Sequence, residues 1–161
     1  MATATKSTRE EMLARIRGQA RMQAGPSQLM RFIATELARL PDYNWVGFYL
    51  LSRSDSQMLE LGEFVGAPTP HTRIPLNQGI CGAAVSSGET IVVDDVNSDP
   101  RYLACSVETK SEIVVPIYVH GRVAGELDID SHTPAAFGTQ DRAFLEECAA
   151  IVGAALAAGE Q

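Results

Sequence analysis

The sequence predicts a single α+β domain in which an antiparallel sheet carries helices on one face. Two helical patterns open the chain, a run of mostly hairpin-connected strand patterns follows, and one long helical pattern comes last. With 161 residues, of which 45% are hydrophobic, the chain can form one well-buried core but not two. One domain over residues 1–161 is therefore expected, with N-terminal helices over about 8–40, the sheet and its loops over about 43–131, and a C-terminal helix over about 139–158.

Two amphipathic helices are predicted before the first strand. Ser7 or Thr8 can cap a helix through residues 12–23. The Gly-Pro-Ser sequence at residues 25–27 then ends this helix and caps a second one through residues 28–40.

The first strand is predicted over residues 44–52, which are aromatic and β-branched. Strand alternation puts Trp45, Gly47 and Tyr49 on one face. A polar turn leads to a second strand over residues 57–66.

The middle of the chain combines short elements with loops. Three prolines and an Asn-Gln-Gly turn predict that residues 67–79 form a surface loop rather than a regular element. A short helix over residues 81–88 and a strand over residues 90–96 follow. Residues 97–110 are predicted to form a loop or a short helical segment.

The last part of the sheet is predicted to be a hairpin. Its strands cover residues 111–119 and 122–131, and it turns at His120 and Gly121. The long C-terminal helix is capped near Thr139 and has an acidic residue in its first turn.

Charge and cysteine content exclude several classes of function. The net charge of -7 argues against nucleic acid or an anionic membrane as the main partner, because phosphate contacts need clustered basic residues. No apolar run approaches the length of a membrane span, and the first residues lack the apolar middle of a signal peptide, so a cytoplasmic protein is expected. Three cysteines without a Cys-x-x-Cys pair predict neither a disulfide scaffold nor a zinc site.

The three cysteines fall into two groups. Cys148 shares a helix face with Phe144 and Val152 and is predicted to be a core residue. Cys81 and Cys105 adjoin a glycine turn and a proline-containing loop, positions that place a side chain near the surface or a cleft. At the start of a short helix, Cys81 should have a lowered pKa because backbone N–H groups favour the thiolate. A small residue packed under a tight turn is the alternative.

The GELDIDS segment predicts an acidic strand face. Glu126, Asp128 and Asp130 alternate with apolar residues and therefore project from one face of the strand. Glu112, at the start of the partner strand, can join them. Such a cluster would bind an ammonium group, and like charges at close range would raise the pKa of one member so that it can act as an acid. An ordinary solvated strand face is the alternative.

Six motifs, taken in order, resemble those of one family. They are NWVGFYL, the RIP of TRIPLNQGICGAA, the DV of VVDDV, the LAC of PRYLACS, SEIVVPI and GELDIDS. In this order they are similar to the motifs of free methionine-(R)-sulfoxide reductase, a stand-alone GAF domain, from about Tyr43 to the C-terminal helix. The resemblance implies a six-stranded antiparallel sheet with N- and C-terminal helices packed on one face.

The resemblance also implies an activity, which is the thiol-dependent reduction of free methionine-(R)-sulfoxide. Cys105, in the LAC motif, would attack the sulfoxide sulfur while a carboxylic acid protonates the leaving oxygen, giving methionine and a cysteine sulfenic acid. A second thiol would form a disulfide with the sulfenic acid, and a thioredoxin-like donor would reduce it. Neither a metal nor an organic cofactor is implied.

The substrate-binding residues follow from the same motifs. Glu112, Asp128 and Asp130 match the acidic substrate-binding positions of the family, in agreement with the ammonium site predicted from the residues themselves. Trp45 and Tyr49 match its aromatic wall around the methyl and sulfur end of the substrate, although alternating aromatics are also common in cores. By analogy with this class, a homodimer is expected.

The identity of the second thiol is left open by the sequence. The family usually has its resolving cysteine just before the RIP motif, where this chain has His71 and no thiol. Cys81 matches the family's cysteine between the glycines of GICG. Either Cys81 resolves the intermediate, or an external thiol does, or this chain has lost the activity. Tyr102 and Ser106 also depart from the family's pattern around the nucleophile.

A second function fits the same fold. Most GAF domains are sensors, so the chain can instead be a non-catalytic small-molecule-binding module that acts through a partner protein. The signature of cyclic-nucleotide GAF domains is not visible. An assay that couples NADPH to thioredoxin and offers each sulfoxide epimer distinguishes the two.

Overall fold

The computed structural model describes residues 6–103 and 106–159 and contains a six-stranded antiparallel sheet in the order β3-β2-β1-β6-β5-β4. The helices are α1 (Lys6–Arg21), α2 (Pro26–Leu37), α3 (Gly79–Ser87) and α4 (Thr139–Gly159), with a 3-10 turn η1 (Val96–Ser98). The strands are β1 (Trp45–Leu51), β2 (Met58–Val65), β3 (Arg73–Pro75), β4 (Ile91–Val93), β5 (Ser111–Val119) and β6 (Arg122–Ser131). None of the helices in the described residues is long and apolar enough to cross a bilayer.

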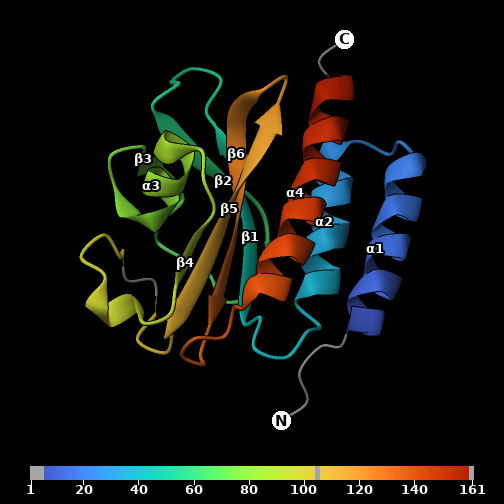
Figure 1. The fold of residues 1–161 in the computed structure, drawn as a ribbon. Coiled ribbons are helices and arrows are strands. Elements are labelled where there is room, and N and C mark those ends of the chain that lie inside the picture. The colour runs from blue at the N-terminus through green and yellow to red at the C-terminus, as the bar shows by residue number, and fades with distance from the viewer. Residues whose placement is uncertain (1–5, 104–105, 160–161) are drawn as a thin grey trace.

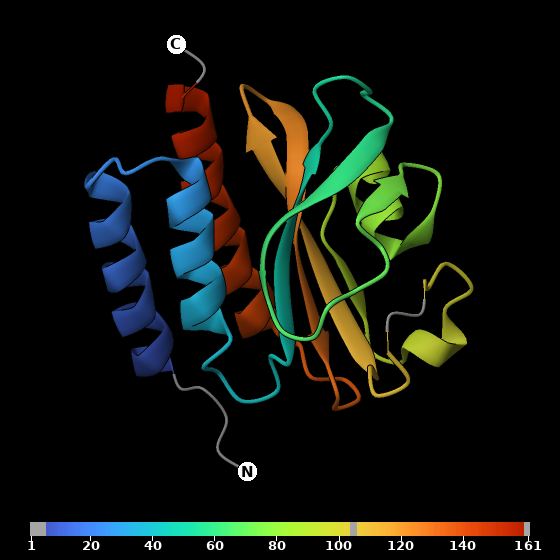
Figure 2. The same cartoon turned by 180° about the vertical axis from the view of Figure 1, so that it is seen from behind.

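The two faces of the sheet are covered differently. Helices α2 and α4 lie against one face, α1 packs on the outside of these two helices, and α3 lies with the long loops over the other face (Figures 1 and 2). The predicted packing of the N- and C-terminal helices on one face is confirmed. A core of aliphatic and aromatic side chains fills this interface and includes Phe48, Leu127 and Cys148. A second, smaller core lies between α3 and the sheet.

The register of the central strands gathers the predicted site residues on the α3 face. In the β1–β6 pair, Trp45 lies opposite Asp130, Gly47 opposite Asp128, and Tyr49 opposite Glu126. Strand β5 adds Glu112, which lies opposite Asp130. Because side chains alternate along a strand, the two aromatic and four acidic side chains all project from the same face.

Two predictions about local structure are wrong. Residues 67–79 are not entirely a loop, because β3 pairs with β2 at the sheet edge and buries Ile74. An edge strand accommodates Pro75 at its end, since one side of its backbone needs no partner. Helix α1 begins at Lys6, so Ser7 and Thr8 lie within the helix and do not cap it from outside.

Candidate active site

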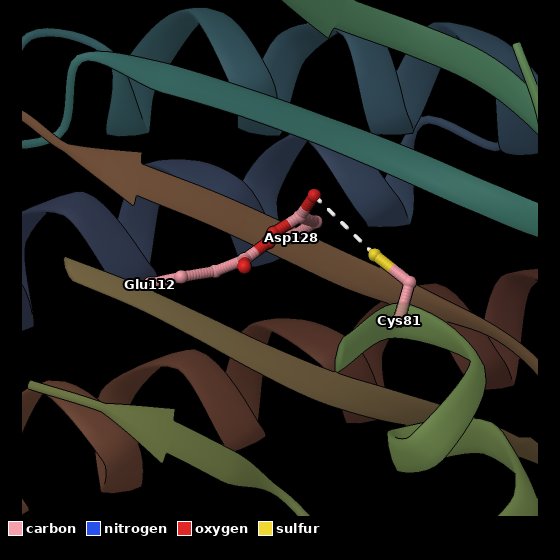
Figure 3. A group of neighbouring side chains, drawn as sticks. All are labelled: Cys81, Glu112 and Asp128. Carbon is pink, nitrogen blue, oxygen red and sulfur yellow. Dashed lines mark hydrogen bonds between the residues drawn. The ribbon is translucent and has the colours of Figure 1, made fainter. Parts of the chain in front are cut away.

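Helix α3 holds Cys81 against the acidic strand. The helix begins at Gly79, whose φ of 72° is accessible to glycine at little cost. A Cβ on Gly82 would lie 2.7 Å from the backbone oxygen of Leu76, so only glycine lets the helix pack this closely on the preceding loop. Cys81 is 5% exposed, and its Sγ lies 3.5 Å from Oδ2 of Asp128, to which the thiol donates (Figure 3).

Three acidic side chains lie around this thiol below α3, and a fourth, Asp130, adjoins them. Ligand atoms of Cys81, Glu112 and Asp128 all lie within 4.8 Å of one another. Asp130 and Glu126 flank Asp128 on the same face of β6, and all four carboxyl groups are buried. The acidic face predicted from GELDIDS is therefore confirmed, and the alternative of a solvated strand face is wrong.

Four oxygen atoms of these carboxyl groups lack a hydrogen-bond partner within the part of the chain that the structure describes. Both carboxylate oxygens of Glu126, Oδ1 of Asp128 and Oδ1 of Asp130 are buried without a hydrogen bond. None of the ion pairs among the described residues involves these acids or Glu112. Buried polar groups are nearly always satisfied, so this cluster is suited to a ligand that donates hydrogen bonds or carries positive charge.

Burial sets the protonation of the cluster. Desolvation, followed by the charges of neighbouring carboxylates, raises the pKa of Glu112, Glu126 and Asp130 well above its usual range. Burial also raises the pKa of Asp128, although hydrogen bonds from Glu112 and Cys81 partly offset this. Without a cation beside them, these groups therefore favour the protonated form, as the sequence predicted for at least one of them.

The predicted lowering of the Cys81 pKa is wrong. Burial raises the pKa of this thiol well above its ordinary value, and the charges of Asp128, Glu126 and Glu112 raise it further. The partial positive charge at the start of α3 is outweighed, because a thiolate here would be desolvated next to carboxylates. The thiol therefore needs a base to take its proton before it can react.

Two aromatic side chains form the wall beside the acids. The rings of Trp45 and Tyr49 lie 6.4 Å apart between centroids, and Trp45 also stacks on Phe64 at 5.7 Å. The Trp45 ring passes over Gly47, where a Cβ would clash with it. Because Gly47 lies opposite Asp128, the indole sits next to the acidic cluster. The Trp45 Nε1–H donates to a backbone carbonyl at 3.0 Å, which fixes the ring.

A small cavity of about 20 Å³ lies where α3, the β2–β3 loop and the acidic strands meet. It is lined by Tyr49, His71, Ile74, Gly79, Ile80, Cys81, Leu103, Glu112 and Asp128. The Tyr49 hydroxyl donates to the His71 carbonyl at 2.7 Å and so closes one side. This volume accommodates one water molecule or one small ion. An amino-acid ligand requires the surrounding loops to open.

Of the other two cysteines, Cys148 lies within the described residues and Cys105 does not. Cys105, the predicted nucleophile, lies outside the described residues, but Leu103, two positions earlier in the sequence, lines the cavity. Cys148 is fully buried in the core beneath α4, which confirms its predicted packing role. Burial raises the pKa of Cys148 to about 12, so it is an inert thiol.

Glu126 belongs to this site, although the sequence predicts it only as part of the acidic strand face and not as a site residue. It is 0% exposed, and its charge raises the pKa of Cys81. The same alternation that identified Asp128 and Asp130 could have included Glu126, since it lies two residues before Asp128 on the same face.

Glu126→Gln is expected to raise the free energy of unfolding at neutral pH and to flatten its pH dependence. An unfolded glutamate ionises near pH 4.3, whereas burial holds the folded-state pKa of Glu126 well above its usual range. Between these two values the unfolded chain binds fewer protons. The contribution of Glu126 to the free energy of unfolding is therefore fully present below the pKa of the unfolded-state glutamate. It falls as pH rises toward the pKa of Glu126 in the folded state, by up to about 1.4 kcal/mol per pH unit.

Urea denaturation at about pH 5 and about pH 7 measures this effect as the difference in unfolding free energy. The matched control is Glu60→Gln, because the Glu60 side chain on β2 is 48% exposed. If the unfolding free energies of wild type and Glu126→Gln depend equally on pH, then Glu126 has the same pKa in the folded and unfolded states.

The comparisons with known proteins agree with this geometry. A model of the GAF domain family matches residues 25–156. The protein of Saccharomyces cerevisiae named free methionine-R-sulfoxide reductase is 43% identical over 112 residues, which cover 69% of this chain and 62% of the yeast protein. The Escherichia coli protein of the same name is 35% identical over 140 residues, which cover 84% of this chain and 82% of that protein.

A solved structure extends the likeness to the whole fold. The X-ray structure of free methionine-R-sulfoxide reductase from Neisseria meningitidis in complex with its substrate superposes with a TM-score of 0.92. It is 35% identical and covers 100% of this chain and 95% of that chain. The fold and the family model together define a GAF domain. The chain belongs to the GAF domain family and, within it, to the free methionine-R-sulfoxide reductases, which are oxidoreductases.

Proposed function

We propose that this chain reduces free L-methionine-(R)-sulfoxide to methionine by thiol chemistry at the site beneath α3. The observation that carries the proposal is the group of four buried carboxyl groups beside Cys81, with no cationic partner among the described residues. A free amino acid supplies an ammonium group, which satisfies such a site. The names of the related proteins and the substrate complex of the Neisseria enzyme support the same substrate.

The two ends of the substrate bind to different side chains, the ammonium end to carboxyl groups and the sulfur end to aromatic rings. Its ammonium group binds Glu112, Asp128 and Asp130, whose carboxyl groups lose protons as the positive charge arrives. Its methyl and sulfur end lies against Trp45 and Tyr49, which offer apolar and polarisable surface. Since the cavity holds only about 20 Å³, binding opens the loops around it.

Cys105 acts as the nucleophile. Leu103, two positions before Cys105 in the sequence, lines the cavity. The sulfur of Cys105 attacks the sulfoxide sulfur, and a protonated carboxyl group of the cluster donates to the oxygen. The oxygen then moves from the substrate sulfur to the Cys105 sulfur: the S–O bond of the substrate and the new S–S bond break, an S–O bond to Cys105 forms, and methionine leaves with Cys105 as a sulfenic acid.

Cys81 resolves the intermediate. Its thiol proton passes to Asp128, whose Oδ2 already accepts it in a hydrogen bond of 3.5 Å. The sulfur then attacks the sulfenic sulfur of Cys105, releasing water and forming a disulfide. A dithiol donor of the thioredoxin type reduces this disulfide, and we expect the protein to work in the cytosol, where such donors keep thiols reduced.

A single turnover is expected to link Cys81 to Cys105. Reduced protein is mixed with one equivalent of the R epimer, alkylated and digested, and the peptides are mapped by mass spectrometry. The Cys81 and Cys105 peptides should be joined and Cys148 should be alkylated, because Cys148 is buried in the core on the opposite face of the sheet from Cys81.

Cys81→Ser separates attack from resolution. This variant should release one methionine per chain and then retain a sulfenic acid on Cys105, with slower thioredoxin-supported cycling. Unchanged cycling without the linkage would assign resolution to an external thiol.

The sensor function makes a different prediction for the same experiment. A ligand-binding module would bind a small molecule without releasing methionine or changing its thiols. The unpartnered acids beside Cys81 fit binding and catalysis alike, but a thiol hydrogen-bonded to Asp128 favours the enzyme. The homodimer is still a prediction, and sedimentation of the protein in solution would measure its oligomeric state.

A further inference from the structure

We propose that Cys81, Glu112 and Asp128 form a binding site for Zn²⁺, and that the bound ion excludes the ammonium group of the substrate. The second part of this inference rests on the proposed function, whereas the metal site itself does not. The three side chains come from different elements, α3, β5 and β6, and converge beneath α3 (Figure 3).

The distances suit one ion. Zinc bonds of about 2.3 Å to sulfur and about 2.0 Å to oxygen, at a tetrahedral angle, separate the two ligand atoms by about 3.5 Å. The Sγ of Cys81 and Oδ2 of Asp128 are 3.5 Å apart. The three ligand atoms lie within 4.8 Å of one another, so a side-chain adjustment of about 1 Å brings the third ligand into range.

The unsatisfied oxygens point to a cation independently of these distances. Oδ1 of Asp128 and Oδ1 of Asp130 are buried and accept no hydrogen bond, and both side chains are at least nine-tenths buried. A buried carboxyl oxygen without a hydrogen bond is costly, and a bound cation would satisfy it. Asp130 or a water molecule completes the coordination.

Size and ligand type select the ion. The cavity of about 20 Å³ between Cys81 and the acids admits one small ion in the closed form, whereas an amino acid must open it. A thiolate ligand favours zinc over magnesium and calcium, which prefer oxygen alone. On binding, Cys81 gives up its proton to solvent and a Zn–S bond forms.

The consequence is reversible inhibition. Zinc removes the proposed resolving thiol and neutralises two of the three carboxylates proposed to hold the ammonium group. No oxidation or reduction is involved, so a chelator should restore the site.

Calorimetric titration of the reduced, demetallated protein with Zn²⁺ tests the site. We expect one zinc per chain, with affinity reduced about 100-fold in Cys81→Ser and in Asp128→Asn. Cys148→Ala is the matched control and should bind as wild type does, since Cys148 lies in the core on the opposite face of the sheet. Cys105→Ser should also keep the wild-type affinity.

Cobalt gives a readout that no structural role of Cys81 would mimic. Co²⁺ in the site should show a thiolate-to-metal charge-transfer band in wild type and in Cys105→Ser, and no such band in Cys81→Ser. Asp128→Asn tests the same site if Cys81→Ser does not fold. Unchanged zinc affinity in both Cys81→Ser and Asp128→Asn, or a band that depends on Cys105 instead, would overturn the proposal.

A competition experiment between zinc and the sulfoxide tests whether bound zinc excludes the substrate, separately from whether zinc binds. In Cys105→Ser, which should bind the sulfoxide without reducing it, rising concentrations of free methionine-(R)-sulfoxide should weaken the apparent zinc affinity in proportion. Zinc binding with no effect of sulfoxide would refute the exclusion of substrate. Zinc binding in a protein that binds no sulfoxide would refute the proposed function and leave the metal site standing.

Discussion

Cys105→Ser is expected to lower the reduction of free methionine-(R)-sulfoxide by on the order of 10³-fold or more, because no other thiol is placed to replace the nucleophile. Cys81 is buried, and both its burial and its acidic neighbours hold its pKa well above the ordinary value. Cys148 lies on the opposite face of the sheet. Methionine released per chain in one turnover, quantified by chromatography, measures the effect.

Cys148→Ala is the control for this experiment. It removes a buried sulfur from the core and is expected to cost about 1 kcal/mol of stability while leaving turnover near the wild-type rate. Methionine release by Cys105→Ser at the wild-type rate would contradict the assignment of the nucleophile, and loss of activity in Cys148→Ala with a folded protein would contradict the assignment of Cys148 to the core.

Asp130→Asn is expected to raise KM for the free sulfoxide on the order of 10²-fold with a smaller effect on kcat. Truncating one partner of a buried charge pair typically costs 2–5 kcal/mol, roughly what that change in affinity requires. Asp130 is chosen because Asp128 also contacts Cys81 and would disturb both binding and chemistry. Initial rates over a range of sulfoxide concentrations separate the two parameters.

The blocked substrate completes this test. N-acetylmethionine sulfoxide lacks the ammonium group, so wild type should discriminate strongly against it and Asp130→Asn should discriminate less. The control is Glu60→Gln on the exposed surface of β2, which should behave as wild type. An equal KM for free and blocked substrates in wild type would refute the ammonium site.

Much of the site could be predicted from local patterns. The alternation in GELDIDS is sufficient to place Asp128 and Asp130 on one face, because the strand period of two leaves no other arrangement. The helical spacing around Cys148 similarly predicted its burial. The hairpin turn at residues 120–121 brings Glu112 close to this segment, but a bulge between Ile117 and Tyr118 is also needed to set Glu112 opposite Asp130.

What could not be predicted depends on packing between distant elements. The position of Cys81 at the start of a helix predicts a lowered pKa. The sequence does not show that α3 packs this thiol against three carboxyl groups, which raise the pKa instead. Strand β3 was missed because its three residues contain a proline and are a strand only through pairing with β2. The small cavity is likewise formed by residues from six separate segments of the chain.

The most direct test of the proposed activity is a coupled assay that follows NADPH through thioredoxin reductase and thioredoxin, with each epimer of free methionine sulfoxide offered separately. With the R epimer, NADPH should be consumed and methionine should appear in equal amounts, and the S epimer should give neither. No methionine from the R epimer with folded, fully reduced protein, or equal rates with both epimers, would contradict the proposed activity.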